Sequence, residues 1–181
     1  IQLSETEKTI WLGNEQIDFS ITAIALPEDA TNKNIIVEVD DNLVVEYLGP
    51  SKEAAGMHNF RTMNKGTATI TFKSEDNPSV VAKCVVNVKR KVTEIAFDGF
   101  NEPLYNDGVA REVALTFWPE DADFDASALS VRIESTQFNF DYYGWNVVEV
   151  EQGEVSGNSV AFEFTPMALC QNSNVIFEYD A

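Results

Sequence analysis

The 181-residue sequence predicts an all-β protein made of two tandem β-sandwiches. Apolar and polar residues alternate along much of the chain, as they do in strands with one buried face. Turn-forming residues separate these short segments at intervals of roughly 8–12 residues, which favours a sandwich. The tetrapeptide Pro-Glu-Asp-Ala occurs at 27–30 and again at 119–122, each time after an alternating segment. A motif that returns at one domain's length indicates one unit used twice.

In the first unit, the clearest strand is Thr67–Phe72, where threonines alternate with Ala68, Ile70 and Phe72. Four further segments have strand composition, at 17–25, 34–39, 43–48 and 80–89. Turn signals rich in Gly, Pro, Asn and Asp separate them, at 27–29, 40–42, 49–50, 64–66 and 75–78. Helical periodicity extends over no more than about a turn and a half, so we expect helices to be incidental.

The second unit is predicted to repeat this order, with strands at 93–97, 112–118, 129–133, 147–150, 160–164 and 175–179. In our alignment the segment that starts at Gly157 corresponds to the one that starts at Gly66, and 146–149 corresponds to 42–46. The second unit then gains about a dozen residues before its 146–149 segment and loses a similar number before Gly157. We place the domains at 1–91 and 92–181.

The first unit resembles the group-2 bacterial immunoglobulin-like domains of intimin- and invasin-like adhesins. The residues that carry the resemblance are Leu26–Lys33, Asn64–Thr71 and Val85–Val88, and in the second unit Trp118–Ala122. The resemblance implies two immunoglobulin-like sandwiches. Paired modules of this kind are similar to surface lipoproteins of gut Bacteroidetes. That similarity implies a processed export form on the outer cell surface, and a membrane association only through a lipid anchor outside this chain.

Negative charge is concentrated in the second unit. Up to Val92 there are 10 Lys and Arg against 13 Asp and Glu, a net charge of −3. From Thr93 onward Arg111 and Arg132 face 17 acidic residues, a net charge of −15. Such a surface repels nucleic acid phosphates and anionic lipids, so we expect neither as a partner. Solubility is the ordinary explanation, and a cationic partner or calcium is the alternative.

The sequence offers little for catalysis, and we expect no enzyme. The single histidine, His58, is expected to be a structural residue, and Cys84 and Cys170 to be buried free thiols. The chain has no Gly-x-Ser-x-Gly motif, no phosphate-binding glycine loop and no Cys/His zinc spacing. A hydrolase that uses two carboxylates ranks last, because nothing selects a pair. We expect no cofactor, with calcium as the one exception.

The calcium hypothesis rests on Asp121, Asp123 and Asp125, whose spacing can direct three carboxylates at one hard cation. The helix–loop–helix calcium motif then requires Gly at its sixth position and Glu at its twelfth. This chain has Ala126 and Arg132 there, so that motif is absent. A solvated acidic turn is the preferred interpretation.

The most unusual segment is rich in aromatic residues and lies in the added stretch of the second unit. Of the 20 aromatic residues in the chain, 15 follow Val92. Such a segment can stack on sugar rings or form the centre of a protein interface, and it can equally cap the sandwich core. Its candidate binding residues are Phe138, Phe140, Asp141, Tyr142, Tyr143 and Trp145.

These observations predict a non-catalytic, extracellular adhesion or spacer module that binds a protein or a glycan on a cell surface. The first unit is expected to be mainly a scaffold, and the second unit the place of a binding face. The alternative is a carbohydrate-binding accessory protein of a polysaccharide-uptake system that uses residues 138–145.

Overall fold

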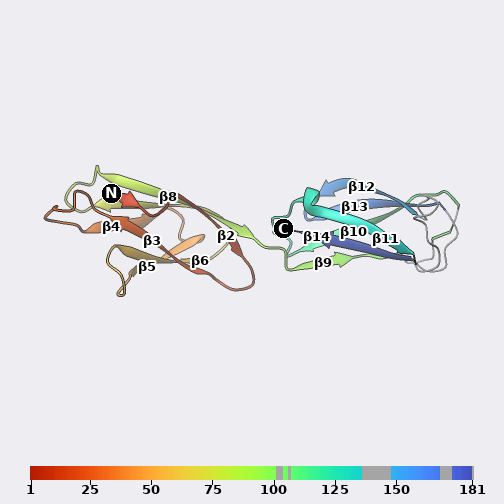
Figure 1. Ribbon diagram of the computed structural model, residues 1–181, viewed down its shortest axis with the longest axis horizontal. Helices are drawn as coiled ribbons and strands as arrows, with labels where there is room; N and C mark the ends of the chain where they lie inside the picture. The colour runs from red at the N-terminus through yellow and green to blue at the C-terminus, as the bar shows by residue number, and fades with distance from the viewer. Residues whose placement is uncertain (101–103, 106, 136–147, 168–172, 181) are drawn as a thin grey trace. The chain divides into compact units, whose positions relative to one another are not determined.

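The structure is a computed structural model that describes residues 1–100, 104–105, 107–135, 148–167 and 173–180. By its internal contacts the chain divides into two compact units, Ile1–Lys91 and Val92–Ala181. The regular structure of the described residues consists of strands, with one short 3₁₀ helix, η1 (Ala126–Ala128) (Figure 1). No helix among them is long and apolar enough to cross a membrane. The predicted all-β class, with immunoglobulin-like sandwiches, is confirmed.

The first unit packs two four-stranded sheets face to face. One sheet has the order β1-β3-β6-β5, with strands at Gln2–Leu3, Asp18–Ile24, Met57–Thr62 and Val45–Pro50. The other has the order β2-β8-β7-β4, with strands at Glu7–Leu12, Val81–Arg90, Gly66–Ser74 and Ile35–Val39. All neighbours are antiparallel except β2, which pairs in parallel with β8.

Alternation along the strands directs one face of each sheet into the core of the first unit. Phe60 from one sheet and Ile70 and Phe72 from the other are fully buried. The Phe60 ring centroid lies 5.4 Å from that of Phe19 and 5.2 Å from that of Tyr47 in the same sheet, and 6.3 Å from that of Phe72 in the opposite sheet. Because burial of apolar area is the main driving force for folding, this contact between sheets holds the unit together.

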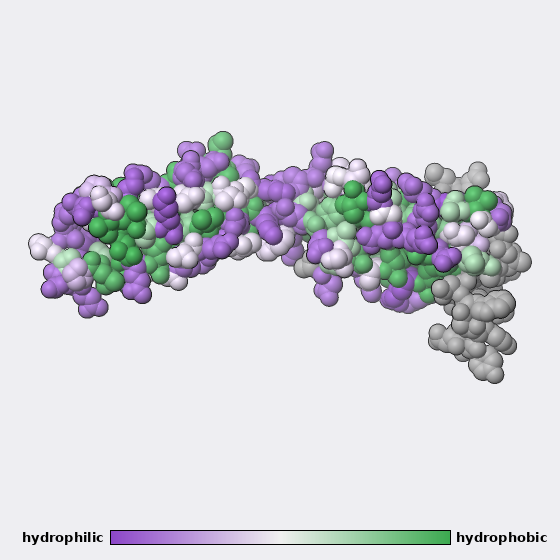
Figure 2. All heavy atoms as spheres, turned by 90° about the horizontal axis from the view of Figure 1, so that it is seen from above, coloured by the Kyte–Doolittle hydropathy of each residue, from purple (hydrophilic) through white to green (hydrophobic). Residues whose placement is uncertain are grey.

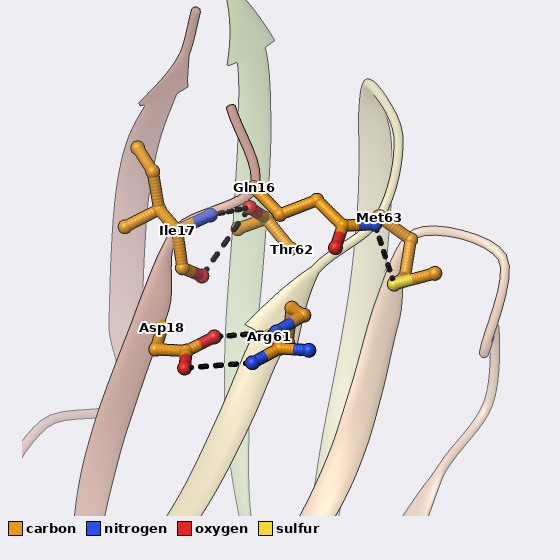
Figure 3. Close-up of polar contacts among 6 residues, drawn as sticks. All are labelled: Gln16, Ile17, Asp18, Arg61, Thr62 and Met63. Carbon is orange, nitrogen blue, oxygen red and sulfur yellow. Dashed lines mark hydrogen bonds and ion pairs between the residues drawn. The ribbon is translucent and has the colours of Figure 1, made fainter. Parts of the chain in front are cut away.

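Polar contacts fix the start of β3 against the end of β6 (Figure 3). The backbone N–H of Ile17 donates to Oγ1 of Thr62 at 2.9 Å, so a hydroxyl that is fully buried has a partner. The guanidinium of Arg61 donates two hydrogen bonds to the carboxylate of Asp18, at 2.6 and 2.9 Å. These hydrogen bonds hold the pKa of Asp18 below its usual value. The two contacts act on neighbouring residues and therefore define one register between the strands.

The second unit has one four-stranded sheet and one two-stranded sheet. The larger has the order β12-β13-β10-β9, with strands at Val148–Ser156, Ser159–Pro166, Arg111–Trp118 and Glu94–Phe97. The smaller pairs β11 (Leu129–Ser135) with β14 (Ser173–Tyr179). Its core contains Leu115, Phe117, Val160, Phe162 and Phe164, each no more than 1% exposed.

The repeated tetrapeptide forms the same turn in both units. It ends β3 in the first unit and β10 in the second, and in each copy the peptide bond before the proline is cis. The backbone N–H of Ala30 donates to the carbonyl of Pro27 at 3.0 Å, and that of Ala122 to the carbonyl of Pro119 at 2.8 Å. The tetrapeptide therefore places β10 as the counterpart of β3.

Strand pairing corrects our alignment of the two units. β13 pairs with β10 and β12 in the way that β6 pairs with β3 and β5. Gly157 lies in the turn before β13, so its counterpart is Gly56, and our alignment of Gly157 with Gly66 was wrong. Both turn glycines have positive φ, 58° and 77°. The counterpart of β7 is β14, because each pairs with the strand that follows the tetrapeptide.

The alignment failed because β6 was not predicted as a strand. Its inward-facing residues are His58, Phe60 and Thr62, of which only Phe60 is apolar. Polar side chains at buried positions hid the alternation on which the prediction relied. The short strands β1 and β2 were also missed, and β12 extends six residues beyond the predicted end at Val150.

Candidate binding surface

Three glutamates form a row across the outer face of the larger sheet in the second unit. In register, Glu163 of β13 lies opposite Glu112 of β10 on one side and opposite Glu151 of β12 on the other. All three side chains are exposed. Directly opposite residues have Cβ atoms about 4.5–5.5 Å apart, a distance at which like charges destabilise a sheet. We name these three residues the acidic ladder.

The residues beside the acidic ladder are small. Ala114 lies opposite Ala161 in the next register position on the same face. A Cβ atom placed on Gly153 would lie 3.4 Å from the Cβ of Ala161. Gly153 and Ala161 are therefore neighbours, and neither has a side chain larger than a methyl group. The unit's two arginines form ion pairs with other acidic residues: Arg111, at the start of β10, with Asp107, and Arg132, on β11, with Glu134 and Glu178. The outer face around the ladder is therefore acidic, with small residues next to the three carboxylates.

Neutralising the centre of the ladder is expected to stabilise the second unit. Glu163→Gln removes a charge that repels both neighbours, so the free energy of unfolding should rise by about 0.2–1 kcal/mol at low salt. The gain should shrink at high ionic strength, which screens exposed charges. Urea denaturation at low and high salt measures it.

The matched control for this substitution is Glu178→Gln. It removes an exposed glutamate that lies 3.3 Å from the guanidinium of Arg132, and it should leave the stability unchanged or slightly lower. A lower stability of Glu163→Gln at low salt would show that the ladder is not repulsive.

The predicted calcium residues lie in the turn after β10 and do not converge. The carboxylate of Asp125 accepts hydrogen bonds from the backbone N–H of Ser127 at 2.9 Å and from its hydroxyl at 2.7 Å. It thereby caps η1, and these bonds hold the pKa of Asp125 below its usual value. Asp121 and Asp123 precede it in the turn. Among the described residues, no three His, Cys, Asp or Glu side chains are grouped to hold a metal ion.

The aromatic candidate segment lies outside the described residues. Both interpretations of it, as a binding surface and as a cap on the core, therefore stay predictions. The segment comprises Phe138, Phe140, Asp141, Tyr142, Tyr143 and Trp145.

His58 and Cys84 are residues of types that often act in catalysis, and both are buried in the core of the first unit. His58 is 7% exposed, and its Nδ1 is 2.9 Å from the hydroxyl of Tyr47. Burial lowers the pKa of His58 and raises that of Tyr47. Cys84 is a buried free thiol, and burial raises its pKa to about 11. A thiol of that pKa is not a nucleophile at neutral pH. Cys170 lies outside the described residues.

Burial of His58 makes the stability of the first unit pH-dependent. The imidazole has a pKa near 6.5 in an unfolded chain and a lower one in the fold. Below about pH 6.5 the unfolded chain takes up a proton that the native state does not. The free energy of unfolding should therefore fall as the pH drops through this range, by at most about 1.4 kcal/mol per pH unit.

Denaturation of the first unit between pH 5.5 and 7.5 tests this dependence. His58 is the only histidine, so His58→Phe should flatten the profile even where it lowers the stability overall. A variant that keeps the wild-type slope would assign the slope to another group.

No protein-family model matches the chain, and no curated protein does. Among solved structures, FdeC, an adhesin of Escherichia coli, aligns with a TM-score of 0.53 and 8% identity over 98% of this chain. The chain spans 58% of that structure. Domains 1–6 of the surface layer protein SbsC align over 99% of this chain and 25% of theirs, at 13% identity and a TM-score of 0.37. The similarity to FdeC concerns the fold alone, and the alignment with SbsC is too weak to support an argument.

Proposed function

We propose that this chain is a non-catalytic, extracellular module of a bacterial surface protein, used for adhesion or spacing, in which the second unit carries the binding face. The tandem immunoglobulin-like fold, which FdeC shares, supports the surface role. The observation that carries the proposal is the difference between the units. The first has a net charge of −3 and two complete four-stranded sheets, whereas the second has a net charge of −15.

The acidic ladder supports a binding face on the second unit. Like charges directly opposite one another oppose the stability of their own sheet, so solubility alone does not account for placing them in one row. A face of one charge sign attracts a complementary partner and accelerates its association. The partner that fits is a basic protein surface on another cell, or a glycan that carries amino groups.

Binding of the full chain to arrays of surface proteins and glycans tests the proposal. We expect salt-dependent binding that is lost in a triple variant, Glu112→Gln with Glu151→Gln and Glu163→Gln. The matched control removes three exposed carboxylates from the first unit, with Glu28→Gln, Asp29→Gln and Glu53→Gln. Equal loss in both variants would assign the effect to net charge, and no binding by the wild type would contradict adhesion.

A carbohydrate-binding accessory protein is the second candidate, because 15 of the 20 aromatic residues follow Val92. Its test is the triple replacement Tyr142→Ala, Tyr143→Ala and Trp145→Ala. Lost glycan binding at an unchanged melting temperature would favour this candidate. A large fall in the melting temperature would identify the segment as a cap on the core.

A further inference from the structure

β4 is an edge strand in the interior of the first unit's sequence. In the part of the chain that the structure describes, it pairs with β7 alone. The chain on both sides of β4 is described, and it forms turns there: Ala30 bonds back to Pro27 before the strand, and Val45 bonds back to Asp41 after it. The strands that precede and follow it, β3 and β5, belong to the other sheet. One side of β4 therefore has no strand beside it among the described residues.

The backbone of β4 directs alternate residues toward this free side. In an antiparallel pair, hydrogen-bonded residues alternate with residues that are not hydrogen-bonded to the partner. At one end of β4 the carbonyl of Asn34 accepts from the N–H of Glu75 at 3.1 Å, and at the other end the N–H of Asp40 donates to the carbonyl of Thr69 at 3.2 Å. The even-numbered residues between these ends therefore bond to β7. The odd-numbered residues, whose N–H and C=O groups face the free side, are Ile35, Val37 and Val39.

The side chains at this edge are apolar and incompletely covered. Val37 and Val39 are only half-buried, although they lie opposite Phe72 and Ile70, which are fully buried. Ile36, on the outer face, is 45% exposed. Apolar side chains reach the surface in several places on both units (Figure 2), as they do on most proteins. At β4 they coincide with a free backbone edge.

β4 also lacks the features by which proteins keep sheet edges from pairing, namely short length, charge, proline and bulges. The other edges of the first unit have such features. β1 is two residues long, β2 carries Glu7 and Lys8, and β5 has a bulge and ends at Pro50. The one charged residue of β4, Glu38, forms an ion pair with Lys73 of β7. The edge of β4 is thus left suited to pairing with another strand.

We propose that β4 pairs with β4 of a second copy of this chain, antiparallel and about a two-fold axis at Val37. This register places Val37 opposite Val37, and Ile35 opposite Val39. It joins two four-stranded sheets into one sheet of eight strands. The outward N–H and C=O groups of the odd-numbered residues then have partners, and their half-buried side chains cover one another.

An identical strand fits this edge because the edge is self-complementary. With the axis at Val37 all five residues of β4 pair, and apolar side chains meet apolar side chains on the inner face. Glu38 lies opposite Ile36 of the second copy and keeps its ion pair with Lys73, so the two glutamates are not opposed. An axis at Glu38 would set the two carboxylates opposite one another. The net charge of the first unit is only −3, so it opposes the contact weakly.

The contact is isologous, so it closes at two copies and does not form fibres. Because five residues make a small interface, we expect a weak dimer with a dissociation constant of about 1–100 µM. The inference does not depend on the proposed function.

Sedimentation of the full chain over a range of concentrations measures the association. Val37→Pro removes the N–H at the axis, which β7 does not use, and proline is tolerated where the N–H of an edge strand faces solvent. This variant should weaken the dimer at least about tenfold. The matched control, Val37→Ile, keeps both the N–H and the β-branched side chain and should dimerise like the wild type. Hydrogen exchange at the odd-numbered amides of β4 should slow as the dimer forms.

Disulfide cross-linking tests the register. In the proposed dimer Ile36 and Glu38 of the second copy form a non-hydrogen-bonded pair with Cα atoms about 4.5 Å apart, a distance that a disulfide can span. Copies with Ile36→Cys, mixed with copies with Glu38→Cys, should therefore cross-link under mild oxidation, and neither variant should do so alone. All chains carry Cys170→Ser, which leaves the buried Cys84 as the only native thiol.

Four results would overturn the proposal. A wild-type chain that stays monomeric at about 1 mM would show that the edge does not self-associate. Equal association of Val37→Pro and Val37→Ile would place the contact on another surface. Equal cross-linking by Ile36→Cys alone and by the mixture would exclude the register. Slow exchange of the odd-numbered amides in the monomer would show that the edge is already covered. If Val37→Pro unfolds the first unit, the cross-linking decides, because both of its substitutions are at exposed positions.

Discussion

Replacing Phe60 with alanine is expected to lower the free energy of unfolding of the first unit by about 3–5 kcal/mol. Phe60 is fully buried on β6, between β3 and β5. Its ring contacts Phe19 and Tyr47, and it reaches Phe72 of the opposite sheet with ring centroids 6.3 Å apart. Truncation removes the apolar contacts of this ring, including the one with the opposite sheet, and leaves a cavity in a close-packed core.

Unfolding of the full chain in urea, followed by hydrogen exchange of each unit, measures this loss. The two units have separate cores, so the transition of the second unit should stay in place. Leu43→Ala is the control, because that side chain is 71% exposed and its loss should cost less than about 0.5 kcal/mol. A Phe60→Ala loss no larger than the control's would mean that Phe60 does not hold the two sheets together.

Sequence pattern predicts the strands of this fold where the buried positions are apolar. Thr67–Phe72 was predicted correctly, because polar and apolar residues alternate without exception there. β6 was missed because one of its buried residues, His58, is polar. Its burial is tolerated because the imidazole lies within hydrogen-bonding distance of Tyr47, which is 11 residues away in the sequence. Long-range polar partners make a buried polar residue tolerable, and they leave no signal in a local window.

The acidic ladder could not be predicted for a related reason. Glu112, Glu151 and Glu163 each stand at an ordinary outward position of their own strand. Only the register between three strands brings them together. The alignment of the two units failed for the same reason, because it was made from sequence alone, without the pairing and register of the strands. A glycine turn followed by alternating residues describes β7 and β13 equally well, so Gly157 was aligned with Gly66 in place of Gly56.

Gly66→Ala is expected to lower the free energy of unfolding of the first unit by about 2–4 kcal/mol. Gly66 begins β7 with φ at 151°, a conformation that is costly for any residue with a Cβ atom. A Cβ there would also lie 2.6 Å from Cγ2 of Val44, a buried β-branched side chain whose χ1 rotation is restricted. Gly13→Ala is the matched control, because a Cβ at Gly13 meets no atom within 4 Å.

A double-mutant cycle separates the steric part of this loss from the backbone part. Val44→Ala alone removes buried methyl groups and should destabilise the unit. Combined with Gly66→Ala, it also removes the atom with which the new Cβ collides. The double variant should therefore lose less stability than the sum of the two single variants, by about 0.5–3 kcal/mol. Strict additivity in urea denaturation would mean that the loss at Gly66 comes from its backbone conformation alone.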